Sequence, residues 1–165
     1  MAIRVLVVDD CEPWRRFIRL ALLSYEKVQI TGEASDGLDA VRNAQHLQLD
    51  LILLDIGLPG LNGIEAVRKI RKVSPTSKIL FVSENRAWEI AEETLRAGGS
   101  GYVVKSDAAS ELTTAISALL QGEQFLSTCL AGNRLANDGA DEGSFRPQRP
   151  EAAFYFDDQQ RKPPG

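Results

Sequence analysis

Histidine and cysteine are nearly absent from this sequence. Its 165 residues include one histidine, His46, and two cysteines, Cys11 and Cys129. Two cysteines make neither a disulfide framework nor a cysteine-rich metal site. A histidine in a polar stretch is expected at the surface, so any histidine-based catalysis would have to use His46.

Long hydrophobic runs and an excess of basic charge are also missing. The longest apolar runs are too short to span a bilayer, and the N-terminus leads into a strand pattern rather than a signal peptide. The 19 basic and 23 acidic residues leave a net charge of −4, which argues against general nucleic-acid binding. These absences predict a cytoplasmic globular protein that binds neither a membrane nor, directly, DNA.

Strand and helix patterns alternate through the first three quarters of the chain. Five short apolar runs of strand length, each followed by a helical pattern, lie at residues 3–8, 28–33, 50–55, 78–83 and 101–104. Such alternation predicts a parallel sheet with helices on both faces. We therefore predict an α/β fold, a flavodoxin-like (βα)5 three-layer sandwich with strand order 2-1-3-4-5. The last helix is expected to start after Ser106 or Asp107, with Glu111 as its capping-box partner.

The character of the chain changes from Ala131 onward. Gly, Asn, Asp, Arg and Pro dominate there, opposite charges nearly balance, and no periodicity remains apart from the trio Phe154-Tyr155-Phe156. We expect a domain of residues 1–125 followed by a disordered C-terminal tail of residues 126–165. The aromatic trio leaves two alternatives open, because it could dock on the domain or be the remnant of a second one.

Polar side chains end four of the five predicted strands. Asp9 and Asp10 follow the first strand, Asp55 the third, Ser83 the fourth and Lys105 the fifth. The carboxyl ends of parallel strands meet at one edge of the sheet, where ligands bind. Carboxylates packed together there repel one another unless a cation neutralises them, and an all-oxygen site suits Mg²⁺. The sequence therefore predicts a magnesium site at this edge.

The same edge has the groups that phosphoryl transfer requires. The loop after Asp55 can add a backbone carbonyl, at Gly57, to the metal ligands, while Lys105 and Ser83 complete a pocket for a doubly charged phosphoryl group. A carboxylate can be the nucleophile and form an aspartyl-phosphate. We assign this role to Asp55, because it stands alone at the centre, whereas the first strand supplies a pair of carboxylates suited to a metal.

Taken together, these residues resemble the receiver domain of bacterial two-component response regulators. The resemblance covers residues 1–125, and the residues of the matching segments are most similar to those of receivers of the NarL/FixJ class. The matching segments are Val-Val-Asp9-Asp10, Leu-Leu-Asp55-Ile-Gly-Leu-Pro-Gly-Leu-Asn-Gly63, Phe-Val-Ser83-Glu and Gly101-Tyr102-Val-Val-Lys105.

The resemblance implies a phosphoacceptor and a metal site. Asp55 would accept a phosphoryl group from a histidine kinase or a phosphotransfer protein. Asp9, Asp10, Asp55 and the backbone carbonyl of Gly57 would hold Mg²⁺. The protein would then be a signalling receiver rather than an enzyme, catalysing only its own phosphorylation and dephosphorylation.

The resemblance also implies a switch. Lys105 and Ser83 would contact the phosphoryl group, and Ser83 and Tyr102 would be the switch residues, with the Tyr102 ring turning inward after phosphorylation. Such a local charge event would change the preference of a protein-binding surface. The downstream protein is unknown, and homodimerisation on phosphorylation is one interaction that the resemblance allows.

Two features depart from the family pattern. Ser106 stands where the family often has proline after a cis peptide, and a cis bond before serine would cost about 3–4 kcal/mol, which leaves this loop's conformation open. NarL/FixJ-class regulators also have a C-terminal DNA-binding domain, and the sequence after Leu130 is too short and irregular for one.

Three functions remain open at this point. The chain could be a stand-alone receiver that signals by protein contact or relays phosphoryl groups. It could instead be the receiver part of a truncated NarL/FixJ-type DNA-binding transcriptional regulator. The third alternative is an aspartate-nucleophile phosphatase resembling the haloacid dehalogenase type, which is disfavoured because that family has a second acid two residues after the nucleophile, where this chain has Gly57.

Overall fold

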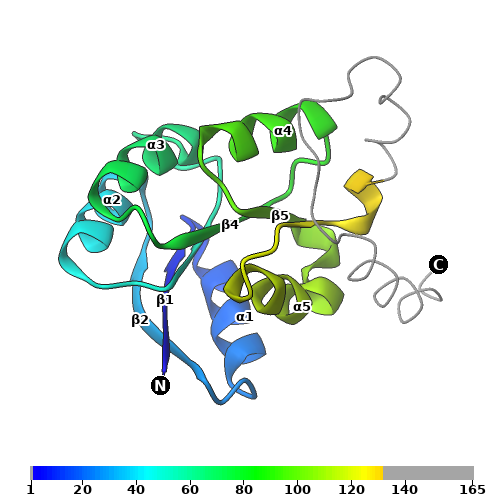
Figure 1. Ribbon diagram of the computed structural model, residues 1–165, viewed down its shortest axis with the longest axis horizontal. Coiled ribbons are helices and arrows are strands. Elements are labelled where there is room, and N and C mark those ends of the chain that lie inside the picture. Colours follow the sequence, from blue (N-terminus) through cyan, green and yellow to red (C-terminus); the bar gives the residue numbers. More distant parts are fainter. Residues whose placement is uncertain (1, 132–165) are drawn as a thin grey trace.

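The computed structural model describes residues 2–131 and contains a six-stranded parallel sheet (Figure 1). Its order is β2-β1-β3-β4-β5-β6, which confirms the predicted order of the first five strands. The strands are β1 (Ile3–Val8), β2 (Val28–Ala34), β3 (Leu51–Leu54), β4 (Lys78–Ser83), β5 (Gly101–Val104) and β6 (Phe125–Leu126).

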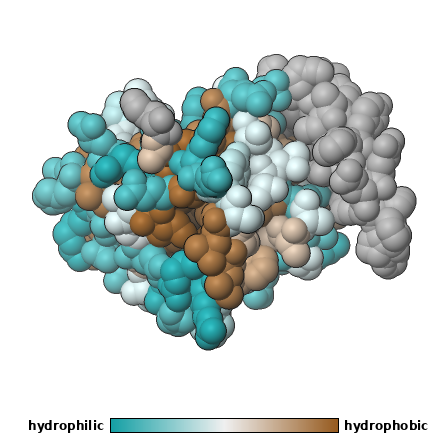
Figure 2. Space-filling view, turned by 90° about the horizontal axis from the view of Figure 1, so that it is seen from below, coloured by the Kyte–Doolittle hydropathy of each residue, from teal (hydrophilic) through white to brown (hydrophobic). Residues whose placement is uncertain are grey.

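Helices cover both faces of the sheet and make three layers. One face is covered by α1 (Glu12–Leu22) and α5 (Ala108–Leu120), and the other by α2 (Gly37–His46), α3 (Gly63–Val73) and α4 (Trp88–Ala97) (Figure 1). Seen from the side of α1 and α5, the surface mixes hydrophilic and hydrophobic side chains (Figure 2), and α1 with its C-cap leaves Leu20 and Leu23 exposed. No helix within residues 2–131 is long and apolar enough to cross a membrane.

Strand β3 lies inside the sheet and has no exposed face. Its four side chains are all buried. They alternate between the two halves of the core, with Leu51 and Leu53 packing in the α1/α5 cluster and Ile52 and Leu54 in the α2–α4 cluster. An unbroken apolar run forms this strand because both of its faces are covered by helices.

The strand register brings the predicted site residues to one edge. Val8 pairs with Leu54 across β1 and β3, so the residue after each strand lies beside the other. The Asp55 N–H donates to the Val8 carbonyl over 3.1 Å, which fixes Asp55 next to the end of β1. Ser83 pairs with Val104 in β5, and this places the end of β4 beside Lys105.

The packed chain extends beyond the domain end expected from the sequence. Phe125 and Leu126 add a sixth strand next to β5, and a helical turn follows at residues 128–131. Leu126, Ser127 and Leu130 are fully buried, so the prediction of a tail starting at residue 126 is wrong in its starting point. Residues 132–165, with the aromatic trio, lie outside the described residues, and disorder there stays a prediction.

Helix α5 starts after Asp107, as predicted, but it lacks the predicted side-chain cap. A short 3-10 turn (Lys105–Asp107) precedes the helix, and Asp107 makes no side-chain cap hydrogen bond. Glu111 is not a capping partner but is fully buried. Its carboxylate accepts hydrogen bonds from the Ser127 hydroxyl at 2.6 Å and from the Thr128 N–H and hydroxyl at 3.1 and 3.0 Å. Glu111 therefore fastens the C-terminal segment of residues 125–131 to α5.

Candidate functional site

A pocket of about 910 Å³ opens at the carboxyl ends of β1, β3, β4 and β5. Each of these strands ends in a polar residue or is followed directly by one, because the apolar run that forms the buried strand stops at the edge of the core. Six of the seven predicted site residues line this pocket, namely Asp9, Asp10, Asp55, Gly57, Ser83 and Lys105.

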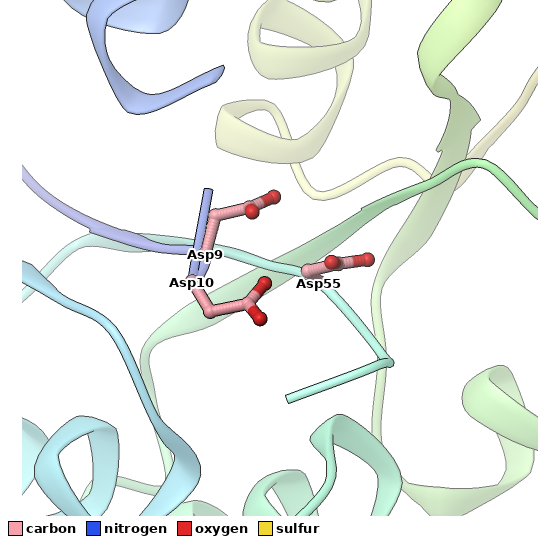
Figure 3. A group of neighbouring side chains, drawn as sticks. All are labelled: Asp9, Asp10 and Asp55. Atoms are coloured by element: carbon pink, nitrogen blue, oxygen red, sulfur yellow. The ribbon is translucent and has the colours of Figure 1, made fainter. Parts of the chain in front are cut away.

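Three carboxylates converge in the pocket. Asp9 and Asp10 lie at the end of β1 and Asp55 at the end of β3 (Figure 3). One oxygen from each lies within 4.8 Å of the others. Asp9 is buried, Asp55 is partly buried and Asp10 is exposed, so the group extends from the core to the protein surface.

The two oxygens of Asp9 have different environments. Oδ1 accepts a hydrogen bond of 2.9 Å from the Cys11 N–H, which holds the carboxylate in place. Oδ2 is buried and lies 2.7 Å from the Lys105 ammonium nitrogen, but it accepts no aligned hydrogen bond. A buried carboxylate oxygen with spare acceptor capacity is suited to coordinate a cation.

Asp55 is held by the backbone on one side and faces Lys105 on the other. Its Oδ1 accepts a hydrogen bond of 2.8 Å from the Ile56 N–H, and its Oδ2 lies 3.5 Å from Lys105 Nζ. Burial and the nearby charge of Asp9 raise the pKa of Asp55, although Lys105 partly opposes them. The fold therefore leaves this carboxylate short of compensating positive charge.

Lys105 is the cation in direct contact with the acidic cluster. Its side chain is only 10% exposed. Burial lowers the pKa of Lys105, but the carboxylates of Asp9 and Asp55 outweigh that effect, and the pKa is raised. The ammonium therefore remains charged, and it contacts the carboxylates of Asp9 and Asp55.

The acidic cluster fits a divalent cation. Its ligand atoms are all oxygens, and they lie close enough together to share one ion. One Asp9 oxygen also has no aligned hydrogen-bond donor. Hard cations such as Mg²⁺ prefer such ligands and retain several waters. Gly57 lies exposed on the loop beside these residues, and its carbonyl as a fourth ligand stays a prediction.

Ser83 and Tyr102 are joined through the loop after β4. The Ser83 hydroxyl is nearly buried, and it accepts a hydrogen bond of 3.1 Å from the Asn85 N–H. The Tyr102 hydroxyl donates to the Asn85 carbonyl at 2.9 Å. The Tyr102 ring is fully buried behind the pocket and is stacked near Phe81. Its inward turn after phosphorylation stays a prediction.

The loop after Lys105 has a regular geometry. Every peptide bond in residues 2–131 is trans, including the one before Ser106 that the sequence left open. The Ser106 hydroxyl accepts a hydrogen bond of 2.9 Å from Arg86. This contact joins the loop after β5 to the loop after β4 at the rim of the pocket.

Trp14 also lines the pocket, outside the seven residues that the sequence analysis assigned to the site. Helical spacing assigns Trp14 to the core face of α1, but its ring is only partly buried, and the Lys105 ammonium lies 4.9 Å from the ring centroid. The available signal was position, because α1 starts just after the acidic pair, and its first turn therefore lies beside the pocket.

The comparison with protein families gives one match over most of the described chain. Residues 5–117 match the response regulator receiver domain. The sequence is 32% identical over 152 residues to the response regulator GacA of Pseudomonas aeruginosa, covering 92% of this chain and 68% of GacA. It is 33% identical over 129 residues to UvrY of Escherichia coli, covering 78% and 59% of the two chains.

A third relative also matches most of this chain over only part of its own length. The chain is 35% identical over 138 residues to the transcriptional regulatory protein LiaR of Bacillus subtilis, covering 81% of this chain and 64% of LiaR. The chain thus spans 59–68% of the length of these curated relatives.

Solved structures agree with the sequence comparisons. A LuxR-family two-component response regulator from Aurantimonas is similar with a TM-score of 0.79 and 31% identity, covering 86% of this chain and all of that one. The isolated receiver domain of RcsB from Salmonella enterica, determined with the phosphomimetic beryllofluoride, has a TM-score of 0.75 and 25% identity over 80% of this chain and 98% of its own.

Proposed function

The chain belongs to the response regulator receiver family, and from this premise we propose that Asp55 is its phosphoacceptor, with Mg²⁺ as the required ion. The observation that supports the proposal most directly is the convergence of three carboxylates and one ammonium at the end of the central strands. A receiver is a signalling domain, so the chemistry it needs is limited to its own phosphorylation and dephosphorylation.

In this proposal Asp55 is the nucleophile. An oxygen of Asp55 forms a bond to phosphorus while the phosphorus–nitrogen bond of a kinase or phosphotransfer phosphohistidine breaks, and the electron pair stays on the histidine nitrogen. The Ile56 N–H holds the Asp55 carboxylate in a fixed orientation. The rise in the pKa of Asp55 caused by burial indicates an anion that gains from added positive charge.

Asp9, Asp10 and Asp55, with the carbonyl of Gly57, would hold the magnesium ion. When bound, the ion supplies positive charge that offsets the negative charge on the transferring phosphoryl oxygens. Lys105, whose Nζ lies 3.5 Å from Asp55 Oδ2, neutralises charge on the other side of the pocket, and the Ser83 hydroxyl offers a hydrogen bond to the phosphoryl group.

Mass spectrometry tests the assignment of Asp55. Incubation of the chain with acetyl phosphate and Mg²⁺ should add one phosphoryl mass, and Asp55→Asn should abolish the addition. Asp39→Asn is the matched control, because Asp39 is a half-exposed carboxylate on α2 with only a 3.6 Å ion pair to Arg42. Retained labelling of Asp55→Asn, at any other residue, would refute the proposal.

The output of the receiver is a separate proposal. We infer that phosphorylation changes a protein-binding surface near Tyr102 and that this chain does not itself bind DNA, since its net charge is −4. The second candidate is the receiver part of a longer transcriptional regulator, favoured by LiaR, of which the match spans 64%. A gel-shift assay at physiological salt tests the first, because tight sequence-dependent binding of duplex DNA by this chain would refute it.

An assay for phosphatase turnover tests the third alternative. Asp55 is followed two residues later by Gly57, which has no side chain to protonate a leaving group. We expect no turnover of a generic phosphate ester such as p-nitrophenyl phosphate. Sustained turnover that depends on Asp55 would instead indicate a phosphatase.

A further inference from the structure

Trp14 covers the ammonium group of Lys105. Trp14 lies in the first turn of α1 and lines the phosphorylation pocket. Lys105 Nζ lies 4.9 Å from the centroid of its ring, inside the range of about 6 Å in which a cation is attracted to an aromatic face. The ring and the carboxylates of Asp9 and Asp55 contact this ammonium, and Glu84 lies in the same pocket.

We propose that Trp14 is a positioning residue that holds the Lys105 ammonium over the pocket while Asp55 is phosphorylated. This inference rests on the proposed phosphorylation of Asp55 and adds a residue outside the carboxylates, the hydroxyl and the lysine that the pocket was expected to use.

The distances show why Lys105 needs a second kind of partner. Its Nζ lies 2.7 Å from Asp9 Oδ2 but 3.5 Å from Asp55 Oδ2, so the ammonium lies nearer to the metal-binding carboxylate than to the nucleophile. A divalent cation shared by the three carboxylates competes for the Asp9 oxygen and repels the ammonium. The Trp14 ring is not a metal ligand, so its attraction for Lys105 persists when the contact with Asp9 weakens.

The contact with Trp14 can also be retained as Lys105 approaches Asp55. To reach a charge-assisted hydrogen-bond distance of about 2.8 Å from Asp55 Oδ2, Nζ has to move by roughly 0.7 Å from its present 3.5 Å. Even a move directed away from the ring leaves Nζ within about 6 Å of the centroid. The ring therefore restricts Lys105 to the pocket without preventing the shift toward the phosphoryl group.

A purely structural role for Trp14 makes a different prediction. Trp14 is partly buried against the α1/α5 half of the core and lies 4.7 Å from the Phe17 ring. If packing were its only role, substitutions would change the melting temperature and leave the rate of phosphorylation of the folded protein unchanged. The electronic character of the ring, as opposed to its size, separates the two roles.

Fluorinated tryptophan provides the decisive experiment. The chain has two tryptophans, so Trp88→Phe leaves residue 14 as the only indole, and mono-, di- and trifluorotryptophan can be incorporated there. Each fluorine removes electron density from the ring face with little change in shape. With acetyl phosphate and saturating Mg²⁺, the rate of Asp55 phosphorylation should fall stepwise along the series at a constant melting temperature. A rate independent of fluorination would overturn the proposal.

A second pair of variants avoids altering Trp88. In the full chain, Trp14→Phe keeps an aromatic face and should retain most of the rate, whereas Trp14→Leu should slow phosphorylation about 2- to 30-fold. Tyr25→Leu is the matched control, because Tyr25 packs on the same half of the core but lies away from the pocket. Equal rates for the Phe and Leu variants at position 14 would contradict a role for the ring.

A spectroscopic measurement tests the contact without any phosphoryl donor or metal. In the Trp88→Phe background, Lys105→Met should change the emission spectrum of Trp14, because the ammonium is removed from its ring face. Identical spectra would overturn the contact. If the unaltered chain gains no phosphoryl mass, the proposed function fails, whereas a chain phosphorylated on Asp55 at a rate insensitive to Trp14 refutes this inference alone.

Discussion

At the scale of single residues, the pocket holds more negative charge than the fold neutralises. Burial, followed by the charge of Asp9, raises the pKa of Asp55 above its ordinary value of 3.8. A carboxyl group whose pKa is raised on folding favours the fold when protonated. Its contribution to the free energy of unfolding is present below the pKa of the group in the unfolded state. That contribution is lost as the pH rises through the pKa of the group in the folded state.

This linkage predicts that Asp55→Asn is more stable than the unaltered protein at pH 7 in the presence of a chelator. The variant removes a buried charge, and its melting temperature should be higher by a few degrees, since 1 kcal/mol shifts it by about 2–4 °C for a chain of this size. The advantage should disappear below about pH 4, where both proteins are neutral at this position. Asp39→Asn should show no such pH-dependent gain, and an advantage that persists at low pH would contradict the linkage.

A second prediction at this scale concerns magnesium. Mg²⁺ should raise the melting temperature of the unaltered protein, because an ion bound only by the folded state stabilises it by about 1.4 kcal/mol at ten times its Kd. Asp10→Ala should weaken the affinity measured by titration calorimetry, since Asp10 supplies one of the three converging oxygens. Unchanged affinity in Asp10→Ala, or a chelator that raises the melting temperature, would mean that these carboxylates do not hold the ion.

At the scale of elements, the C-terminal segment of residues 125–131 belongs to the folded domain. Phe125, Leu126 and Leu130 are all buried, and the full burial of such a side chain contributes about 1.5–3 kcal/mol. A chain ended after residue 131 should therefore melt like the full protein. A chain ended after residue 124 should lose several kcal/mol in urea denaturation, a large part of the roughly 5–15 kcal/mol typical of a domain. Equal stability of the two shortened chains would refute this.

A single substitution tests the same segment. The Ser127 hydroxyl donates to Glu111 and accepts from the Val104 N–H at 2.8 Å. Ser127→Ala leaves both buried groups with one partner fewer, and we expect a loss of about 1–3 kcal/mol of unfolding free energy. Ser110→Ala, on the exposed side of α5, is the matched control and should change stability little.

The sequence predicts the strands whose own residues form a clear apolar run. Five apolar runs, mostly of β-branched or aliphatic residues, predicted β1 to β5, and the rule that ligands bind at the carboxyl ends of parallel strands brought Asp9, Asp55, Ser83 and Lys105 together. The two residues of β6 have no pattern of their own. Glu111 matched the spacing of a capping box, but its partner Ser127 lies 16 residues further along the chain. Residue spacing at the start of a helix contains no information about a contact with a segment that follows the helix.

Two contacts in the pocket could not be predicted for a similar reason. Helical spacing assigns Trp14 to a face of α1, but it does not show that the first turn of the helix lies over Lys105. The burial of the Tyr102 ring depends on the carbonyl of Asn85, to which its hydroxyl donates. Both contacts are set by how loops from different strands meet, which no periodicity in one segment encodes.

At the scale of the whole molecule, β5 connects the pocket to the C-terminal segment. Lys105 follows β5 directly and contacts both Asp9 and Asp55. Within β5, the Tyr102 carbonyl accepts a hydrogen bond of 2.9 Å from the Ser127 N–H. A change in charge at Asp55 that moves Ser83 and Lys105 therefore acts on a strand that is hydrogen-bonded to residues 125–131. Such a continuous set of contacts is a physical route, and coupling along it has to be measured.

Beryllofluoride, which mimics a phosphoryl group on a carboxylate, provides that measurement. With Mg²⁺ present, amide chemical shifts should change around Asp55, along residues 83–107 and at residues 125–131, and none should change in Asp55→Ala. Ser127→Ala should keep the shifts in the pocket but reduce those at residues 128–131, because it removes the hydroxyl that bonds Val104 and Glu111. Changes confined to the pocket would mean that β5 does not transmit the event. Equal changes in Ser127→Ala would mean that the signal reaches the C-terminal segment by backbone contacts alone, such as the hydrogen bond between Ser127 and Tyr102.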